Sequence, residues 1–297
     1  MNDSLHTLVA TTDLSAASSR SSLRSAMLAK QVGAQLELIH VLEKSALDEL
    51  QQLYGQDYEV IQKNIRSQTR KELSRLTSQL TKTLGKNVGC HLVEGEVLES
   101  ILAQVKTLNA NILILGERGV GGFVRQLLLG TTTERLVRMS LCPVLVVKRP
   151  PREAYQSVIV PVDFSPWSVK AIHLARTIAP KTEFTLLHAY EVPFEYKMRV
   201  ASEKEEVIRR YRETARQEAE THLHKVAEEE GISTIGCNFI LVRGNATHHI
   251  LEQEEEQGAD LIVLDKHGLG MVEELLLGSC TKQIATQSLC DVLVANH

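Results

Sequence analysis

The chain has 297 residues, of which 43% are hydrophobic, 24% charged and 4% aromatic, and its formal net charge is −4. This length gives room for two domains of ordinary size, each with an apolar core of its own. The acidic balance argues against a nucleic-acid partner. No apolar run reaches the roughly 18 to 20 residues of a membrane-spanning helix, and residues 1–13 lack the regions of a signal peptide, so we expect a cytoplasmic protein without a membrane partner.

Short runs rich in β-branched residues recur along the chain and predict ten strands. The runs at 112–115 and 261–264 are apolar at every position, as central parallel strands covered by helices on both faces require. The expected strands are 6–11, 35–42, 88–94, 111–116 and 143–148 in the first half, and 156–162, 183–190, 234–242, 260–265 and 291–295 in the second.

Amphipathic stretches separate these strands. Residues 61–84 and 208–226 each place apolar side chains on one helical face, and Ser165 followed by Pro166 predicts the start of another helix. Five strands alternating with helices predict an α/β fold in which each half is a doubly wound, five-stranded, Rossmann-like parallel sheet. Sheets of this kind bind ligands beyond the carboxyl ends of their strands.

The second half of the chain repeats the first. A repeat of about half the chain indicates a duplicated domain, because solenoid units are only roughly 20 to 50 residues long. Pro150 and Pro151 follow an apolar run and mark the boundary, so we expect domains at residues 1–149 and 154–297. The matched pairs include Asp13 with Asp163, His40 with His188, Gly119 with Gly268 and Cys142 with Cys290.

Cysteine and histidine spacing gives no sign of a disulfide framework or a metal site. The chain has five cysteines and no CxxC pair, so we expect free thiols. His248 and His249, with Cys237, are the obvious metal candidates, but adjacent helical residues diverge by about 100°, unlike the i, i+4 pair that grips zinc. We therefore predict no metal site. We interpret the acidic run that follows as a solvated helix face: Glu252, Glu254, Glu255 and Glu256.

Glycines and threonines follow the fourth strand of the first half. Gly116 and Gly119 come directly after it, and Gly130 precedes Thr131 and Thr132 at an expected helix start. Glycines let the backbone approach an anion, while threonine hydroxyls and the free N–H groups of a helix start donate hydrogen bonds. The pattern predicts a phosphate cradle, although no GxxxxGK[ST] motif exists. The alternative is that these glycines only turn the chain after a strand.

The spacing of these glycines resembles that of the universal stress protein family. That family carries glycine, two residues, glycine, nine residues and then Gly-Ser or Gly-Thr, which hold the ribose and phosphates of ATP. The first half has Gly116, Gly119 and, after ten intervening residues, Gly130 with Thr131. The second half has Gly268 and, after nine intervening residues, Gly278 with Ser279.

The resemblance covers essentially the whole chain, twice, and implies two domains of the universal stress protein fold. It implies a stress-response protein that binds ATP or a related adenine nucleotide, with or without Mg. Beyond the glycine motifs, it implies nucleotide contacts from Thr12, Asp13 and Val41 in the first half and from Asp163 and Ala189 in the second.

Both halves depart from the family pattern. The first has an extra residue before Gly130, which either bulges outward or pulls Gly130 out of register. The second has Asp265 in place of the first glycine, and like charges about 4 Å apart repel by roughly 4 kcal/mol at an effective dielectric near 20. Residues 1–150 contain 18 Lys and Arg against 14 Asp and Glu, and residues 151–297 contain 15 against 23. We therefore expect the nucleotide mainly in the first domain.

Two pairs of matched residues allow a structural interpretation beside a functional one. Asp13 and Asp163 end their first strands, where they either contact the nucleotide or cap the following helix. His40 and His188 lie in otherwise apolar strands, and we interpret them as buried neutral histidines with a satisfied ring nitrogen.

The sequence favours a regulatory nucleotide-binding protein over a turnover enzyme. We predict no catalytic residues, since the chain has neither a GxSxG nor an HExxH motif. A nucleotide-independent interaction scaffold with decayed cradles and a slow ATPase remain as alternatives. Because single domains of the family commonly pair through their last strands, the resemblance implies that strands 143–148 and 291–295 pair within the chain. Both are short and apolar, and a sheet edge invites an antiparallel partner. We also expect two chains to form a homodimer.

Overall fold

The computed structural model describes residues 5–117, 129–232, 237–266 and 277–296. The chain divides into two units. Unit 1 comprises Met1–Ala154 together with Asp291–His297, and unit 2 comprises Tyr155–Cys290. The last strand of the second repeat is therefore grouped with the first repeat.

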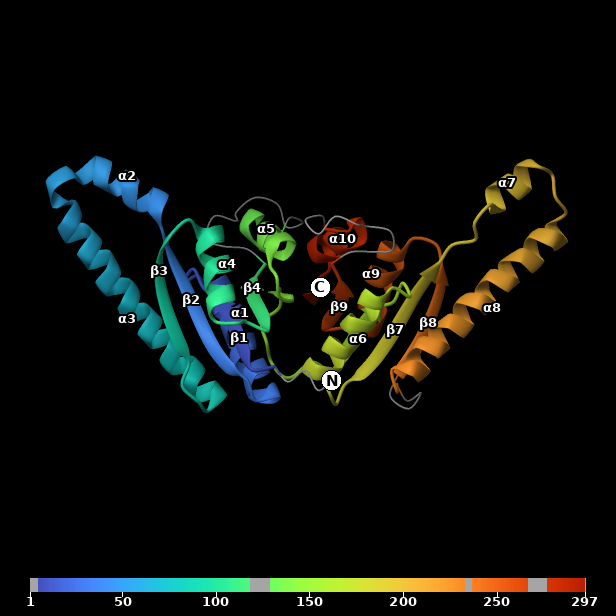
Figure 1. Ribbon diagram of the computed structural model, residues 1–297, viewed down its shortest axis with the longest axis horizontal. Helices are drawn as coiled ribbons and strands as arrows, with labels where there is room; N and C mark the ends of the chain where they lie inside the picture. The colour runs from blue at the N-terminus through green and yellow to red at the C-terminus, as the bar shows by residue number, and fades with distance from the viewer. Residues whose placement is uncertain (1–4, 118–128, 233–236, 267–276, 297) are drawn as a thin grey trace. The chain divides into compact units, whose positions relative to one another are not determined.

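Unit 1 is built on six strands in the order β3-β2-β1-β4-β5-β10 (Figure 1). The first five are parallel, and β10 runs antiparallel to β5. The apolar side chains of β1 and β4 are buried and form the centre of the core. The strands are β1 (Thr7–Thr11), β2 (Gln35–Glu43), β3 (Gly89–Gly95), β4 (Ile112–Gly116), β5 (Val144–Val147) and β10 (Asp291–Ala295).

Helices cover both faces of the sheet in unit 1. From β1 the chain adds β2 and β3 on one side, and it then returns to add β4 and β5 on the other side of β1. Right-handed crossovers therefore put the helices that precede β3 and the helices that follow it on opposite faces of the sheet. Accordingly α1 packs with α3, and α4 packs with α5. The helices are α1 (Ala16–Val32), α2 (Lys44–Tyr54), the 3₁₀ turn η1 (Gly55–Asp57), α3 (Tyr58–Leu84), α4 (Val97–Thr107) and α5 (Thr131–Met139).

Unit 2 repeats this architecture with four parallel strands in the order β9-β6-β7-β8. Its strands are β6 (Ser157–Pro161), β7 (Glu183–Tyr190), β8 (Cys237–Arg243) and β9 (Leu261–Asp265). Its helices are α6 (Pro166–Ile178), α7 (Glu195–Val200), α8 (Glu205–Glu229), α9 (Ala246–Gln257) and α10 (Ser279–Gln287). Within the described ranges, no helix is long and apolar enough to cross a membrane.

The α/β fold class and its mostly parallel sheets are confirmed, and so is the helix start at Ser165, whose side chain accepts from the Ser168 N–H. All five cysteines are free, as expected. The short helices α2 and α7 were not predicted. Leu47 is the one buried residue of α2, and α7 buries none, so neither helix packs extensively on the core.

One residue of the acidic run is not solvated. Glu254 is buried in α9, and its carboxylate accepts hydrogen bonds from the backbone N–H groups of Leu289 (2.8 Å) and Cys290 (2.6 Å). The interpretation of this residue as part of a solvated face was wrong. Its carboxylate instead satisfies two backbone donors of the segment that follows α10.

The predicted pairing of the two last strands is confirmed. Val292, Leu293 and Val294 of β10 lie opposite Val146, Leu145 and Val144 of β5. A buried ion pair joins Asp291 to Arg24 of α1, with 3.3 Å between Oδ2 and Nε. The other carboxylate oxygen accepts from the backbone N–H groups of Lys148 (2.8 Å) and Arg149 (3.2 Å). These contacts fix the beginning of β10 beside the end of β5.

Candidate functional site

The turn after β1 is closed by its own side chains. The Thr12 hydroxyl accepts from the Leu14 N–H (3.0 Å), and the Asp13 carboxylate accepts from the Ser15 N–H (3.0 Å). Ser15 then caps α1 by accepting from the Ser18 N–H (3.1 Å). Leu14 has a φ of 63°, a left-handed conformation that is uncommon outside glycine. Asp13 therefore closes the turn before α1, and the helix cap that the sequence suggested for Asp13 is made by Ser15 instead.

The matching turn in unit 2 has the same form. The Asp163 carboxylate accepts from both the backbone N–H (3.0 Å) and the hydroxyl (2.6 Å) of Ser165. Phe164, like Leu14, has a φ of 63°. Its ring stacks on the His188 ring at a centroid distance of 4.0 Å. The two repeats thus use one turn geometry with different side chains at its left-handed position.

A histidine on the neighbouring strand holds each turn in place. The Nδ1–H of His40 donates to the Thr12 carbonyl (2.8 Å), and that of His188 donates to the Val162 carbonyl (2.6 Å). His40 is buried, whereas His188 is half-buried. Burial lowers the pKa of His188 below 6.5, so its ring is neutral at pH 7. The predicted satisfied ring nitrogens are confirmed.

Glycine caps the helix that begins beyond β4. Gly130 is the N-cap of α5, and as a glycine it has no side chain that could accept from the first turn of this helix. The Gly130 N–H donates to the Glu117 carbonyl (3.0 Å), and the Thr133 hydroxyl donates to the Gly116 carbonyl (3.1 Å). The start of α5 is therefore tied directly to the end of β4.

Unit 2 has the same two contacts. The Gly278 N–H donates to the Lys266 carbonyl (2.9 Å), and the Thr281 hydroxyl donates to the Asp265 carbonyl (2.7 Å). The helix start thus has one register against its strand in both repeats. The extra residue of the first repeat lies between Glu117 and Gly130, and it does not displace Gly130 relative to its counterpart.

Three adjacent strands bring most of the predicted first-half residues to one edge of the sheet. Because β1 lies between β2 and β4, Thr12 and Asp13 emerge beside Val41 and Gly116. Thr131 and Thr132 are exposed in the first turn of α5. The positions in unit 2 follow the same topology: Asp163 after β6, Ala189 in β7, and Gly278 and Ser279 at the start of α10. Gly119 and Gly268 lie outside the described residues.

Charge at the two strand ends differs from the sequence expectation. Asp265, the last residue of β9, is buried, and so is Lys266 beside it. By the shared register, Glu117 occupies the position of Lys266 in the first repeat. Asp265 is therefore followed in the sequence by a lysine, whereas Gly116 is followed by an acid, so the summed charge of these two positions does not favour unit 1. The clear difference between the two cradles is the side chain that Asp265 has and Gly116 lacks.

Comparison with known proteins covers both repeats. The model of the universal stress protein family matches residues 5–148 and again residues 154–296. Universal stress protein YxiE of Bacillus subtilis is 28% identical over 145 residues, which are 47% of this chain and 98% of the relative. Universal stress protein MJ0531 of Methanocaldococcus jannaschii is 29% identical over 141 residues, 47% of this chain and 81% of the relative.

A solved structure matches the fold along the whole chain. The crystal structure of a universal stress protein from Archaeoglobus fulgidus has a TM-score of 0.68 and 20% sequence identity, and the match covers 98% of each chain. The two family matches together span nearly all of the sequence. The chain therefore belongs to the universal stress protein family, as a tandem of two family domains.

Proposed function

We propose that this chain binds ATP or a related adenine nucleotide, mainly in unit 1, and that the nucleotide acts as a regulatory ligand in a cytoplasmic stress response. The proposal rests on the two hydrogen bonds that join the start of α5 to the end of β4. They hold a helix start that is capped by glycine and has two exposed threonines at the strand end where, by the family resemblance, the phosphates bind. Helix starts of this kind are favourable for anions.

The proposed contacts follow from the strand order. Asp13 and the backbone of Val41 face the nucleoside, and Gly116 lies along the ribose and phosphate. Gly130, Thr131 and Thr132 donate hydrogen bonds to the phosphates from the helix start. The Asp13 carboxylate contributes through an oxygen that is not needed for its turn bond to Ser15, because a carboxylate offers about four acceptor positions.

Unit 1 is the better site because its strand ends in glycine. Gly116 has no side chain to separate a ligand from the backbone, whereas Asp265 adds a carboxylate at the same register position. The +4 balance of residues 1–150 also favours an anionic ligand over the −8 balance of residues 151–297.

Mass spectrometry of the nucleotide released from the denatured full-length protein, together with ATP calorimetry on the nucleotide-free protein, tests the proposal. We expect an adenine nucleotide in the first measurement or saturable binding in the second. A preparation that is empty and that also fails to bind ATP would instead support the nucleotide-independent scaffold.

A further inference from the structure

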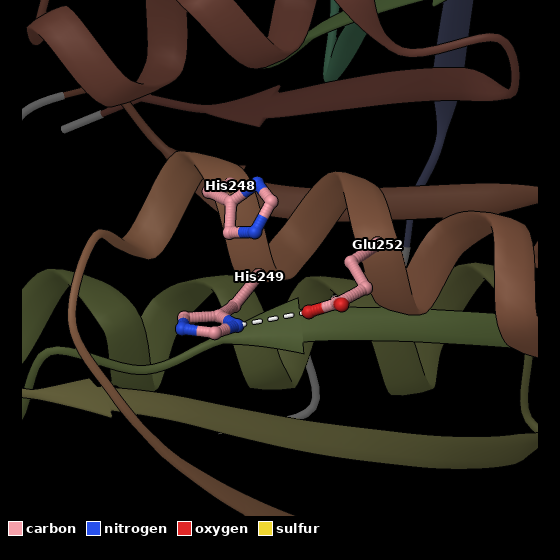
Figure 2. Close-up of side chains that lie close together, drawn as sticks. All are labelled: His248, His249 and Glu252. Carbon is pink, nitrogen blue, oxygen red and sulfur yellow. Dashed lines mark hydrogen bonds and ion pairs between the residues drawn. The ribbon is translucent and has the colours of Figure 1, made fainter.

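A group of possible metal ligands lies on the first turns of α9 in unit 2. Figure 2 shows His248, His249 and Glu252 together on this helix. Each offers one ligand atom, and these atoms all lie within 4.8 Å of one another. His248 and Glu252 are exposed, while His249 is half-buried, so an ion can reach the group from solvent.

Helical geometry explains why the carboxylate unites two histidines that diverge from each other. With His248 as the origin, His249 lies at about 100° around the helix, and Glu252, four residues on, at about 40°. Glu252 is therefore between the two rings when the helix is viewed along its axis. The sequence-based rejection of a metal site considered the histidine pair and Cys237, and it placed Glu252 on a solvated face.

Both ring nitrogens of His249 face oxygen acceptors. Its Nε2–H donates to the carbonyl oxygen of Arg243 (3.1 Å), so in the neutral ring Nδ1 carries the lone pair. That Nδ1 lies 3.0 Å from Oε2 of Glu252 (Figure 2). Two acceptors at this separation repel unless a cation lies between them. That cation is either a proton on the ring or a metal ion.

The distances fit a shared metal ion. At metal–ligand bonds of roughly 2.0 to 2.2 Å and angles of about 90° to 110°, two ligand atoms lie about 3.0 to 3.5 Å apart. The bond from His249 to the Arg243 carbonyl is also the arrangement that usually orients a metal-binding histidine, because it fixes the tautomer and the ring plane. Rotation of the exposed His248 side chain can complete the set, since its ligand atom is already within 4.8 Å.

We propose that His248, His249 and Glu252 bind a divalent transition-metal ion of the zinc type, with a remaining position open to water or to a ligand from another molecule. Two imidazole nitrogens favour Zn²⁺, Co²⁺ or Ni²⁺, whereas Mg²⁺ and Ca²⁺ prefer oxygen ligands. Three exposed ligands near a helix N-terminus hold an ion less tightly than a closed four-ligand structural site. The proposal does not depend on nucleotide binding.

Calorimetric titration of the nucleotide-free full-length protein with ZnCl₂ tests the site. Because the chain also has five free thiols, the informative quantity is the component that ligand substitutions remove. We expect Glu252→Gln and His249→Gln each to weaken one Zn²⁺ site by about tenfold or more. Glu255→Gln, an exposed acid on the same helix, should leave that site unchanged, and MgCl₂ should give no corresponding component.

Thermal melts in EDTA show whether the variants fold normally, and melts in Zn²⁺ provide a second readout. In EDTA the two ligand variants should melt cooperatively, at a Tm lowered only by the lost bonds of His249, and Zn²⁺ should raise the Tm of the wild type and of Glu255→Gln more than that of the two ligand variants. Equal Zn²⁺ titrations for the wild type and both ligand variants would overturn the proposal. They would mean that the ion binds to thiols and that a proton alone joins His249 to Glu252.

Discussion

His40 and His188 connect the second strand of each repeat to the turn after the first. Each ring donates to the carbonyl of the residue immediately before Asp13 or Asp163. The residue immediately after that aspartate has a φ of 63° in both turns. A left-handed non-glycine residue costs on the order of 1 to 3 kcal/mol and persists where surrounding contacts enforce it. Here the histidine, the aspartate and the serine cap enforce it on leucine and phenylalanine alike.

The half-buried His188 predicts a specific pH dependence of stability. Burial lowers its pKa in the folded state below the 6.5 of an unfolded chain. Above pH 6.5 the ring is neutral in both states, and as the pH falls below 6.5 the unfolded state takes up the proton first. The free energy of unfolding should therefore fall with decreasing pH from 6.5 downward.

Urea unfolding at a series of pH values measures this effect. In His188→Asn the decline below pH 6.5 should be shallower than in the wild type, while His224→Asn, on an exposed part of α8, provides a matched control. Identical pH profiles for the wild type and His188→Asn would contradict the assignment.

Substitutions at Gly116, the last residue of β4, and Asp265, the last residue of β9, test whether unit 1 binds ATP more tightly than unit 2. Gly116→Asp puts a carboxylate where we place ribose and phosphate, and it should weaken ATP binding by about 2 to 4 kcal/mol, roughly 30- to 700-fold. Asp265→Gly should create or strengthen binding in unit 2. Calorimetry on the full chain measures both, with one strong site expected for the wild type.

Asp265→Asn separates the two causes, because it removes the charge and keeps the side-chain volume. If volume is the obstacle, this variant should bind like the wild type while Asp265→Gly gains affinity. If the wild type and Asp265→Gly bind ATP at unit 2 with equal affinity, the residue at the strand end does not decide which of the two units binds the nucleotide more tightly.

At the level of elements, the sequence predicts what is buried and misses what is exposed. Strands such as β4 and β9 could be located because both of their faces are apolar. The helix α7 could not, because none of its residues is buried, and α2 was missed although Leu47, Leu50 and Leu53 recur at helical spacing. Glu254 was misplaced for a related reason: charge suggests solvent, and its two backbone donors come from residues 35 and 36 positions away.

The candidate site follows the same distinction. The parallel-sheet topology predicts that Thr12, Asp13, Val41 and Gly116 reach one edge, since strand ends are brought together by the sheet itself. The register of α5 could not be predicted, because a loop with one extra residue can either bulge or shift. The register is set by the hydrogen bonds that Gly130 and Thr133 donate to the carbonyls at the end of β4, more than ten residues earlier in the chain.

The ion pair between Arg24 and Asp291 predicts a large stability effect at the junction of α1, β5 and β10. The two side chains are only 8% and 1% exposed. Removing one partner takes the opposite charge away from a buried side chain, so Asp291→Ala should lower the free energy of unfolding by about 3 to 5 kcal/mol. Arg24→Met should have a cost of the same order.

A double-mutant cycle followed by urea unfolding measures the coupling. The double variant Arg24→Met, Asp291→Ala should cost less than the sum of the two single changes, because it leaves no unpaired buried charge. Strictly additive costs would mean that the pair contributes only through the separate backbone contacts of Asp291 and Arg24.

On the scale of the whole molecule, we predict that the full chain forms a homodimer. The prediction comes from analogy with double-domain relatives, and light scattering at micromolar concentration measures it. A dimer has twice the chain mass of 33.1 kDa, so a measured mass near 33.1 kDa would reject the prediction.

The grouping of β10 with unit 1 predicts that the second repeat completes the first. In a chain ending at Cys290, the β5 edge loses its antiparallel neighbour and Arg24 loses its buried partner. An uncovered apolar edge strand pairs readily with other chains, so this truncated protein should self-associate beyond the full-length state and unfold at lower urea concentration. Light scattering and urea unfolding beside the full chain test both effects. Asp291→Ala in the full chain is the control, since it removes the ion pair and keeps the strand. If the truncated chain has the same assembly state and the same stability as the full chain, then unit 1 does not need β10 either to cover the β5 edge or to remain folded.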